Sequence, residues 1–367
     1  MNAARWFSAS YGEARARFLR AAARNDSAVQ SHLLATHRGL EDEQLATDVV
    51  RLGPPNATRM LAVTSGTHGV EGFCGSAAQL ALLHDKPLHA LLRRLDVAIL
   101  IVHAVNPYGF SHLSRTTEDN IDLNCNDVDF SQPLPRNEAY DLLDEFLVPE
   151  EWPPSRANER AIERYIAERG ESAWRQAVTA GQYTHAEGLC FGGRRKAWST
   201  QVLHSVFAQF GAGCERIGWI DFHAGLGPYG HGEKICIGKA GADELQRARA
   251  WWGADVSWPG EGTAAAASAW GRVPGMLHAA CPHAETAAIA IEFGTVPLID
   301  MLHMLRADTW LRRHPDAPES QQQALRDEIR AAFCCEEEGW MGLTLGQSRG
   351  AILQAVHGLS RVGERGV

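Results

Sequence analysis

The sequence predicts an α/β protein, a three-layer α/β/α domain built on a central mixed, mostly parallel sheet. Three observations predict it. Short apolar runs of strand length recur along the chain, at 59–64, 96–102, 216–222 and 287–293. Segments with helical spacing of apolar residues lie between these runs. The runs are apolar throughout, without alternation, which is typical of a sheet that helices cover on both faces.

Each element before the first long loop has its own signal. Apolar side chains recur at helical spacing over 11–24, so we expect the first helix there. A run rich in β-branched residues predicts a strand over 46–52. The next strand, over 59–64, stops at Ser65-Gly66, a turn signal. The Ala- and Leu-rich stretch over 71–84 predicts the helix that follows this turn.

After the strand at 96–102, sequence rich in Asn, Asp, Ser and Pro predicts a long loop over 106–135. Glycines among aromatic residues and arginines predict a second, ordered loop over 181–198. A short apolar run predicts a further strand over 235–238. The remaining predicted helices cover 137–147, 159–169, 174–180, 199–210 and 320–359, the last with an acidic break at 336–338.

Composition narrows the class of function. The 367 residues carry a formal net charge of −9, which argues against a general binder of nucleic acid or anionic membranes, because these need a basic surface. The strongest apolar run, 97–102, is far shorter than the roughly 20 residues of a bilayer-spanning helix. None of the eight cysteines forms a C-x-x-C pair, and most lie in apolar runs. They predict free core thiols and a reducing compartment, the cytoplasm.

Chemically versatile side chains follow three of the predicted strands. His68 and Glu71 come after one strand, His223 comes after another, and Glu292 ends a third. Because functional groups of open α/β sheets gather at the carboxyl ends of the strands, we expect these four to converge. Two histidines and a glutamate are a ligand set of catalytic zinc, which keeps a fourth position for water. Glu292 is then left as the carboxylate that accepts a proton from that water.

The alternative is that these residues have a purely structural role. An H-x-x-E pair on a helix is usually a surface ion pair, and a histidine at a strand end is usually a hydrogen-bonded polar residue. The joint occurrence of His68, Glu71, His223 and Glu292, in this order and in these flanking contexts, favours the metal site.

Further motifs lie in the predicted 106–135 loop and at the later strand ends. They are Asn106-Pro107, Arg115, Asp122-Leu123-Asn124, Asp221-Phe222-His223 and Ile291-Glu292-Phe293-Gly294-Thr295, in addition to His68-x-x-Glu71. With these motifs the chain resembles the zinc carboxypeptidase (M14-type) superfamily. Within it, the chain is most similar to a DUF2817-like branch related to succinylglutamate desuccinylase/aspartoacylase.

The resemblance implies a role for each matching residue. His68, Glu71 and His223 would bind one Zn²⁺ ion per chain, and Glu292 would be the general base. Arg115 would polarise the scissile carbonyl or bind the substrate.

Two more roles and one departure come from the same loop. The resemblance implies that Asp122 holds the first histidine ligand and that Asn124 contacts a substrate carboxylate. Cys125 stands where the family usually has an arginine that binds a terminal carboxylate. Arg194 and Arg195 are candidates to replace it as substrate contacts. We therefore expect poor activity on ordinary C-terminal peptides, and a gain in such activity from Cys125→Arg.

Other candidate residues receive structural interpretations. Cys125 is interpreted as lining the pocket rather than as a nucleophile, since no histidine partner is placed beside it by the sequence. Tyr229 and His231 follow the third ligand and are interpreted as part of a turn rather than as substrate contacts. Gly192-Gly193 and the arginines after it lack the ending of a phosphate loop. Tryptophans are expected in the core at positions 152, 174, 198, 251, 252 and 270.

The sequence therefore predicts a zinc-dependent hydrolase of an amide bond, in a peptide C-terminus or an N-acyl amino acid. The second choice among enzymes is a deacylase or deamidase that acts on a small metabolite. The sequence also predicts a single catalytic α/β domain over 1–367 with a lid-like insertion at about 133–198. The expected partner is a small-molecule or peptide substrate, with no nucleic acid and no membrane, and a homo-oligomer is left open. The alternative is a non-hydrolytic metal-binding or regulatory protein, which would have no need of an unligated Glu292.

Overall fold

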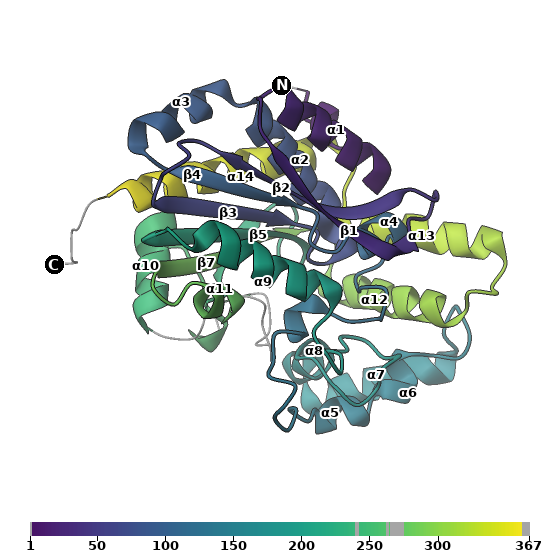
Figure 1. Ribbon diagram of the computed structural model, residues 1–367. Helices are drawn as coiled ribbons and strands as arrows, with labels where there is room; N and C mark the ends of the chain where they lie inside the picture. Colours follow the sequence, from purple (N-terminus) through teal and green to yellow (C-terminus); the bar gives the residue numbers. More distant parts are fainter. Residues whose placement is uncertain (1, 239–241, 262–263, 265–274, 362–367) are drawn as a thin grey trace.

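The computed structural model describes residues 2–238, 242–261, 264 and 275–361. Within these ranges, seven strands form one sheet in the order β1-β2-β4-β3-β5-β7-β6 (Figure 1). The four central strands, β4, β3, β5 and β7, pair in parallel. At the two edges β2 joins β4, β1 joins β2 and β6 joins β7, all antiparallel. The predicted mixed, mostly parallel sheet is confirmed.

The strand bounds follow the predicted runs closely. They are β1 (Val29–Arg38), β2 (Gln44–Leu52), β3 (Arg59–Ser65), β4 (Ala98–His103), β5 (Arg216–Gly225), β6 (Gly232–Cys236) and β7 (Glu285–Gly294). The sequence analysis did not predict β1, because this edge strand is mostly exposed and has no apolar run. The strand expected over 235–238 begins earlier, at Gly232.

In chain order, the described helices are α1 (Tyr11–Ala23), α2 (Gly72–His84), α3 (Lys86–Leu95), α4 (Pro107–His112), α5 (Glu138–Asp141), α6 (Asp144–Leu147), α7 (Arg156–Arg169), α8 (Glu171–Thr179), α9 (Trp198–Gly211), α10 (Ala242–Trp252), α11 (Gly275–Ala280), α12 (Leu298–Arg313), α13 (Glu319–Phe333) and α14 (Glu338–Ser360). The helix predicted over 137–147 is two short helices, and the long one over 320–359 is two helices divided at the predicted acidic break. Five helices were not predicted from the sequence, namely α3, α4, α10, α11 and α12. Of these, α4 had a readable start, because Asn106 caps it and a proline follows.

Helices cover both faces of the sheet because successive strand residues face opposite ways. On β3, Leu61 and Val63 pack in the cluster that contains α1, α2 and α14. Their neighbours Met60 and Ala62 pack in the cluster that contains α9 and α11. Both sides of the strand are therefore buried, which explains why its sequence shows no alternation.

The segment predicted as a lid-like insertion, 133–198, holds α5 to α8 and packs beside α12 (Figure 1). A separate hydrophobic cluster joins it to the helices after β7, through residues such as Tyr140, Trp174, Leu305 and Phe333. This cluster packs at one end of the sheet, next to the carboxyl ends of the parallel strands.

Three of the tryptophans expected in the core, Trp174, Trp251 and Trp252, are buried. Trp152 and Trp198 are half-buried against the core, and residue 270 lies outside the described residues. None of the described helices has the length and apolar character that crossing a membrane requires.

One core histidine makes the stability of the fold pH-dependent. His103 stacks on Phe18, and its Nε2 lies 2.9 Å from the Ser76 hydroxyl, whereas its Nδ1 has no partner among the described residues. Burial lowers the pKa of His103 from 6.5 to about 4, since a charged imidazole would lose its hydration there. The unfolded chain thus binds more protons than the folded chain between these two values.

We therefore expect the free energy of unfolding to fall as the pH falls through this window. His103 alone accounts for about 2 kcal/mol between pH 7 and pH 5. Urea unfolding of the wild type and of His103→Gln at both pH values measures the difference. A pH dependence that is equally steep in the variant would contradict this assignment.

Candidate metal centre and active site

The first two candidate ligands lie on a turn that leaves the end of β3. Gly66 has a φ of +67°, and a short 3₁₀ turn, η2 (Gly69–Glu71), then leads into α2. A Cβ on Gly69 would lie 1.9 Å from the Gly109 carbonyl carbon, so only glycine lets this turn approach α4. The close approach places His68 and Glu71 at the carboxyl edge of the sheet, and both are buried.

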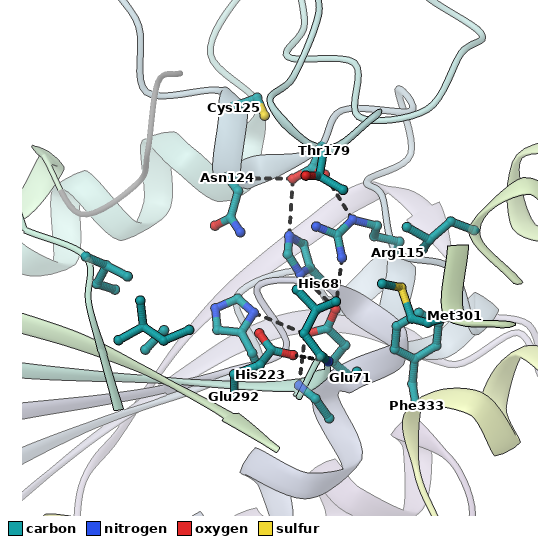
Figure 2. Close-up of a pocket in the computed structure, with 18 residues that line it drawn as sticks. His68, Glu71, Arg115, Asn124, Cys125, Thr179, His223, Glu292, Met301 and Phe333 are labelled. Atoms are coloured by element: carbon teal, nitrogen blue, oxygen red, sulfur yellow. Dashed lines mark hydrogen bonds and ion pairs between the residues drawn. The ribbon is translucent and has the colours of Figure 1, made fainter. Parts of the chain in front are cut away.

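The register of two neighbouring strands supplies the other half of the site. In the β5–β7 pair, His223 lies directly opposite Glu292. Both side chains are buried and face the turn that carries Glu71 (Figure 2). The structure thus brings together the four residues that the sequence analysis expected to converge.

Three of these side chains have the geometry of a metal site. His68, Glu71 and His223 offer ligand atoms that all lie within 4.8 Å of one another. The Glu71 carboxylate is central, with Oε1 2.9 Å from Nδ1 of His68 and Oε2 3.0 Å from Nδ1 of His223. Among the described residues, Glu292 does not belong to this set of close ligand atoms.

A second carboxylate lies behind each histidine. Nε2 of His68 is 3.2 Å from Oδ1 of Asp122, and Nε2 of His223 is 2.8 Å from Oδ2 of Asp221. Metal-ligating histidines typically have such a partner, which orients the ring and raises its basicity. Asp122 therefore lies in contact with His68, and its role in holding a metal ligand stays a prediction.

This donor set fits a divalent cation. Both ring nitrogens of His68 and of His223 face carboxylate oxygens, but a neutral imidazole has only one N–H to donate. The arrangement therefore needs either an extra proton on each ring or a cation between the Nδ1 atoms and Glu71. A zinc ion satisfies this need, and two imidazoles with one carboxylate are ligands that it prefers.

The carboxylates around this site are held in their charged forms. Burial alone would raise the pKa values of Glu71 and Asp122, yet both pKa values are held well below the usual range. Nearby positive charge is the cause, from His68 for Glu71 and from Arg115 and His68 for Asp122. The pKa of Asp221 is likewise lowered by His223. These carboxylates are therefore ionised and available as ligands or partners of ligands.

Glu292 has the opposite character. Burial, together with repulsion from Glu71, raises the pKa of Glu292 from 4.5 to about 7. The backbone N–H of Leu226 donates to its Oε1 at 2.9 Å and fixes the carboxylate. A carboxylate with a pKa near neutrality, beside the ligand set, is suited to accept and return a proton.

Arg115 lies at the same centre but is already engaged. Its Nε donates to Oδ2 of Asp122 and its Nη1 donates to Oε1 of Glu71, each at 3.0 Å. The backbone N–H of Arg115 donates to Asp308 of α12 at 2.8 Å, which anchors the loop that carries it. The guanidinium is thus shared between two buried carboxylates (Figure 2).

A family model covers most of the chain. The family described as "Protein of unknown function (DUF2817)" matches residues 7–347. The chain belongs to the DUF2817 family. This confirms the branch that the motifs predicted. A comparison with curated proteins found no match.

Solved structures resemble the DUF2817 protein in fold. Thrombin-activatable fibrinolysis inhibitor matches with a TM-score of 0.53 at 9% identity, over 96% of this chain and 75% of that one. The bovine inhibitor, bound to tick carboxypeptidase inhibitor, matches with a TM-score of 0.45 at 11% identity, over 93% and 98% of the two chains. A Shewanella frigidimarina protein provisionally assigned as succinylglutamate desuccinylase/aspartoacylase gives 0.37 at 16% identity, over 77% and 69%. At such low identity these likenesses concern the fold alone.

Of the four predicted substrate contacts of the DUF2817 protein, two line the cavity of the site and two do not. Asn124 and Cys125 line the cavity that contains the ligand set, which has a volume of about 90 Å³. Arg194 and Arg195 are exposed and are not among its lining residues, and Arg195 pairs with Asp119 at 3.1 Å. Their proposed role as replacements for the arginine stays a prediction that this geometry does not support.

The turn after β5 agrees with its structural interpretation. The backbone N–H of His231 donates to the Pro228 carbonyl at 3.0 Å, and the side chain of His231 is exposed. The Tyr229 hydroxyl donates to Glu337 at 2.9 Å, which ties this turn to the start of α14. Neither residue lines the cavity.

Cys125 is more tightly packed than the sequence analysis assumed. It is buried, and a Cβ added to Gly181 of the insertion would lie 2.5 Å from its Sγ. The Tyr183 hydroxyl donates to the Cys125 carbonyl at 2.6 Å and holds the insertion against this residue. The insertion therefore occupies the space beside position 125 that a longer side chain would need.

For this reason we now expect Cys125→Arg to destabilise the protein instead of increasing its activity on free carboxylates. A buried, unpaired guanidinium that displaces Gly181 should lower the free energy of unfolding by about 3 kcal/mol or more. Denaturant unfolding measures this loss, with Cys125→Ser as the small-residue control. A variant as stable as the control would show that the arginine does find room.

The sequence analysis missed several residues of the site. Asp221 had a readable signal, because residues two apart on a strand share a face and it precedes His223 by two. Thr179 of α8 and the apolar residues Met301, Leu305 and Phe333 also line the cavity. No local pattern marks these four, since α8, α12 and α13 reach the site only through tertiary packing.

Asp221 should therefore control the metal affinity of the DUF2817 protein. Its Oδ1 accepts hydrogen bonds from the Thr64 and Thr67 hydroxyls, so Oδ2 is held toward His223. We expect Asp221→Asn to weaken zinc binding by about 10–100-fold, because the neutral amide lowers the basicity of the imidazole. Competition with a chromophoric chelator measures this affinity. Asp255→Asn, on the exposed surface, is the control, and equal affinities for the two variants would refute the role.

Proposed function

We propose that this DUF2817 protein is a zinc-dependent hydrolase of amide bonds. The observation that carries the proposal is the buried set of His68, Glu71 and His223 with the unligated carboxylate of Glu292 beside it. A purely structural cluster would have no reason to hold a second buried carboxylate, that of Glu292, against the repulsion of Glu71.

His68, Glu71 and His223 would hold the zinc ion, with Asp122 and Asp221 orienting the two imidazoles. When bound there, zinc would polarise the substrate carbonyl and lower the pKa of a water molecule toward about 7.

Glu292 would move the proton in this reaction. With a pKa of about 7 it is a match for proton transfer at neutral pH, first as the base that accepts the proton of the attacking water. It would then return the proton to the leaving nitrogen. The Leu226 N–H holds Oε1, so the carboxylate keeps one orientation during both steps.

Arg115 would stabilise the negative charge that develops on the carbonyl oxygen. Its Nε and Nη1 are held by Asp122 and Glu71, so the guanidinium is fixed in place before the substrate arrives. Donors that are oriented in advance stabilise a transition state without reorganisation.

The eight free, buried cysteines support the cytoplasm as the compartment in this proposal. No disulfide joins them, and all eight lie within the described ranges.

The test is a screen of the purified protein against pooled N-acyl amino acids, short peptides and uncharged N-acyl amines, with detection of released products by mass spectrometry. The same protein is assayed after chelation and after zinc is restored. We expect product release that depends on zinc and is lost in Glu292→Gln. Stoichiometric zinc without turnover of any amide would contradict the proposal and support the non-hydrolytic alternative.

A further inference from the structure

The charges that line the active-site cavity leave nothing to bind a substrate carboxylate. Among the described lining residues, three carboxylates, Glu71, Asp122 and Glu292, face a single guanidinium, that of Arg115. With Glu292 ionised, the form in which a base accepts a proton, a divalent cation on the ligand set would balance the two remaining negative charges. The cavity then has no excess positive charge, and Asp221, directly behind His223, adds a further negative one.

The one guanidinium cannot serve as a carboxylate clamp in its present position. Arg115 donates to Glu71 and to Asp122 through two different nitrogens, at 3.0 Å each. A third carboxylate would compete with two buried carboxylates that already accept hydrogen bonds from this guanidinium. The other polar lining groups, Asn124 and Thr179, are neutral.

The rest of the lining is apolar and comes from two separate parts of the core. Met301, Leu305 and Phe333 belong to the cluster that joins α12 and α13 to the insertion, and two of them are labelled beside Arg115 in Figure 2. Ile235 of β6 and Ala290 of β7 belong to the cluster that also contains α9 and α11. Both groups of apolar side chains reach the cavity that contains Glu292.

We infer that the substrate is an amide whose groups on both sides of the scissile bond are uncharged and apolar, an N-acyl amine without a neighbouring carboxylate. The inference rests on the proposed function and narrows it. Hydrolysis would break the C–N bond, add the hydroxyl of water to the acyl carbon and add its hydrogen to the nitrogen. A carboxylate on either flank would be desolvated against apolar walls without a counter-charge, which is costly.

The experiment uses four matched amides and the zinc-loaded, full-length protein. The acyl group is pentanoyl or succinyl, and the amine is 3-methylbutylamine or leucine, so that each pair differs by one carboxylate. We expect N-pentanoyl-3-methylbutylamine to have the highest kcat/KM, and each carboxylate to lower it about tenfold or more. A succinyl or leucine conjugate that is hydrolysed as well or better would overturn the inference and leave the proposed function intact.

A binding measurement keeps the test independent of turnover. Pentanohydroxamic acid and succinyl monohydroxamic acid carry the same zinc-binding group and differ by a carboxylate. We expect the uncharged ligand to bind at least tenfold more tightly in titration calorimetry. Equal or reversed affinities would overturn the inference, even if no amide were hydrolysed and the proposed function had failed.

A positive charge introduced into the lining of the cavity tests whether the missing cation causes the preference for uncharged ligands. Thr179 is half-buried and lines the cavity, so Thr179→Lys adds a cation there, and Thr179→Met is the uncharged control of similar length. The lysine variant should lose most of the preference for the uncharged hydroxamate, whereas the methionine variant should keep it. A preference that is unchanged in Thr179→Lys would contradict the electrostatic explanation.

Discussion

Replacing Glu292 by glutamine is expected to lower kcat by about 10²–10⁴-fold while zinc content and fold are retained. Glutamine has the same shape, and its amide oxygen can still accept the Leu226 N–H that now holds Oε1. It cannot accept the proton of the attacking water. Because Glu292 does not belong to the set of close ligand atoms, its replacement should leave the metal in place.

The measurement is single-turnover and steady-state kinetics of an amide found in the screen, with metal analysis of the same samples. Glu285→Gln is the matched control, because Glu285 lies on the same strand but is exposed and paired with Arg216. Activity of Glu292→Gln within about threefold of the wild type would refute the role of general base.

Replacing His223 by alanine is expected to remove both the metal and the activity. The variant loses one of the two Nδ1 donors and leaves the Asp221 and Glu71 carboxylates buried without their shared partner. Zinc bound to protein purified without chelator should fall from stoichiometric to a small fraction. Turnover should fall with it, since no other ligand in the set can replace an imidazole.

Elemental analysis checks this result, and circular dichroism establishes that the variant is folded. His231→Ala is the control, because this exposed histidine is on the turn that follows β5 and is not in the ligand set. His68→Ala should behave like His223→Ala. Full retention of zinc in both ligand variants would exclude the proposed metal centre.

Much of the fold and part of the site could be predicted from local sequence. The central strands were predictable because they are buried on both faces and so are apolar throughout, as in β3 and β4. The pair His68 and Glu71 was predictable because one short turn at a strand end carries both side chains. The edge strand β1 was not predictable, since its exposed residues carry no apolar signal.

What the sequence by itself determined is the chemistry that is available, namely which donors follow which strand. The tertiary structure alone decided how those donors meet. The β5–β7 register placed Glu292 opposite His223, and the packing of the insertion placed Gly181 against Cys125. It also placed Arg195 on Asp119, outside the lining of the cavity. Such contacts join residues far apart in the chain, and they depend on strand register and side-chain packing, which no local pattern encodes.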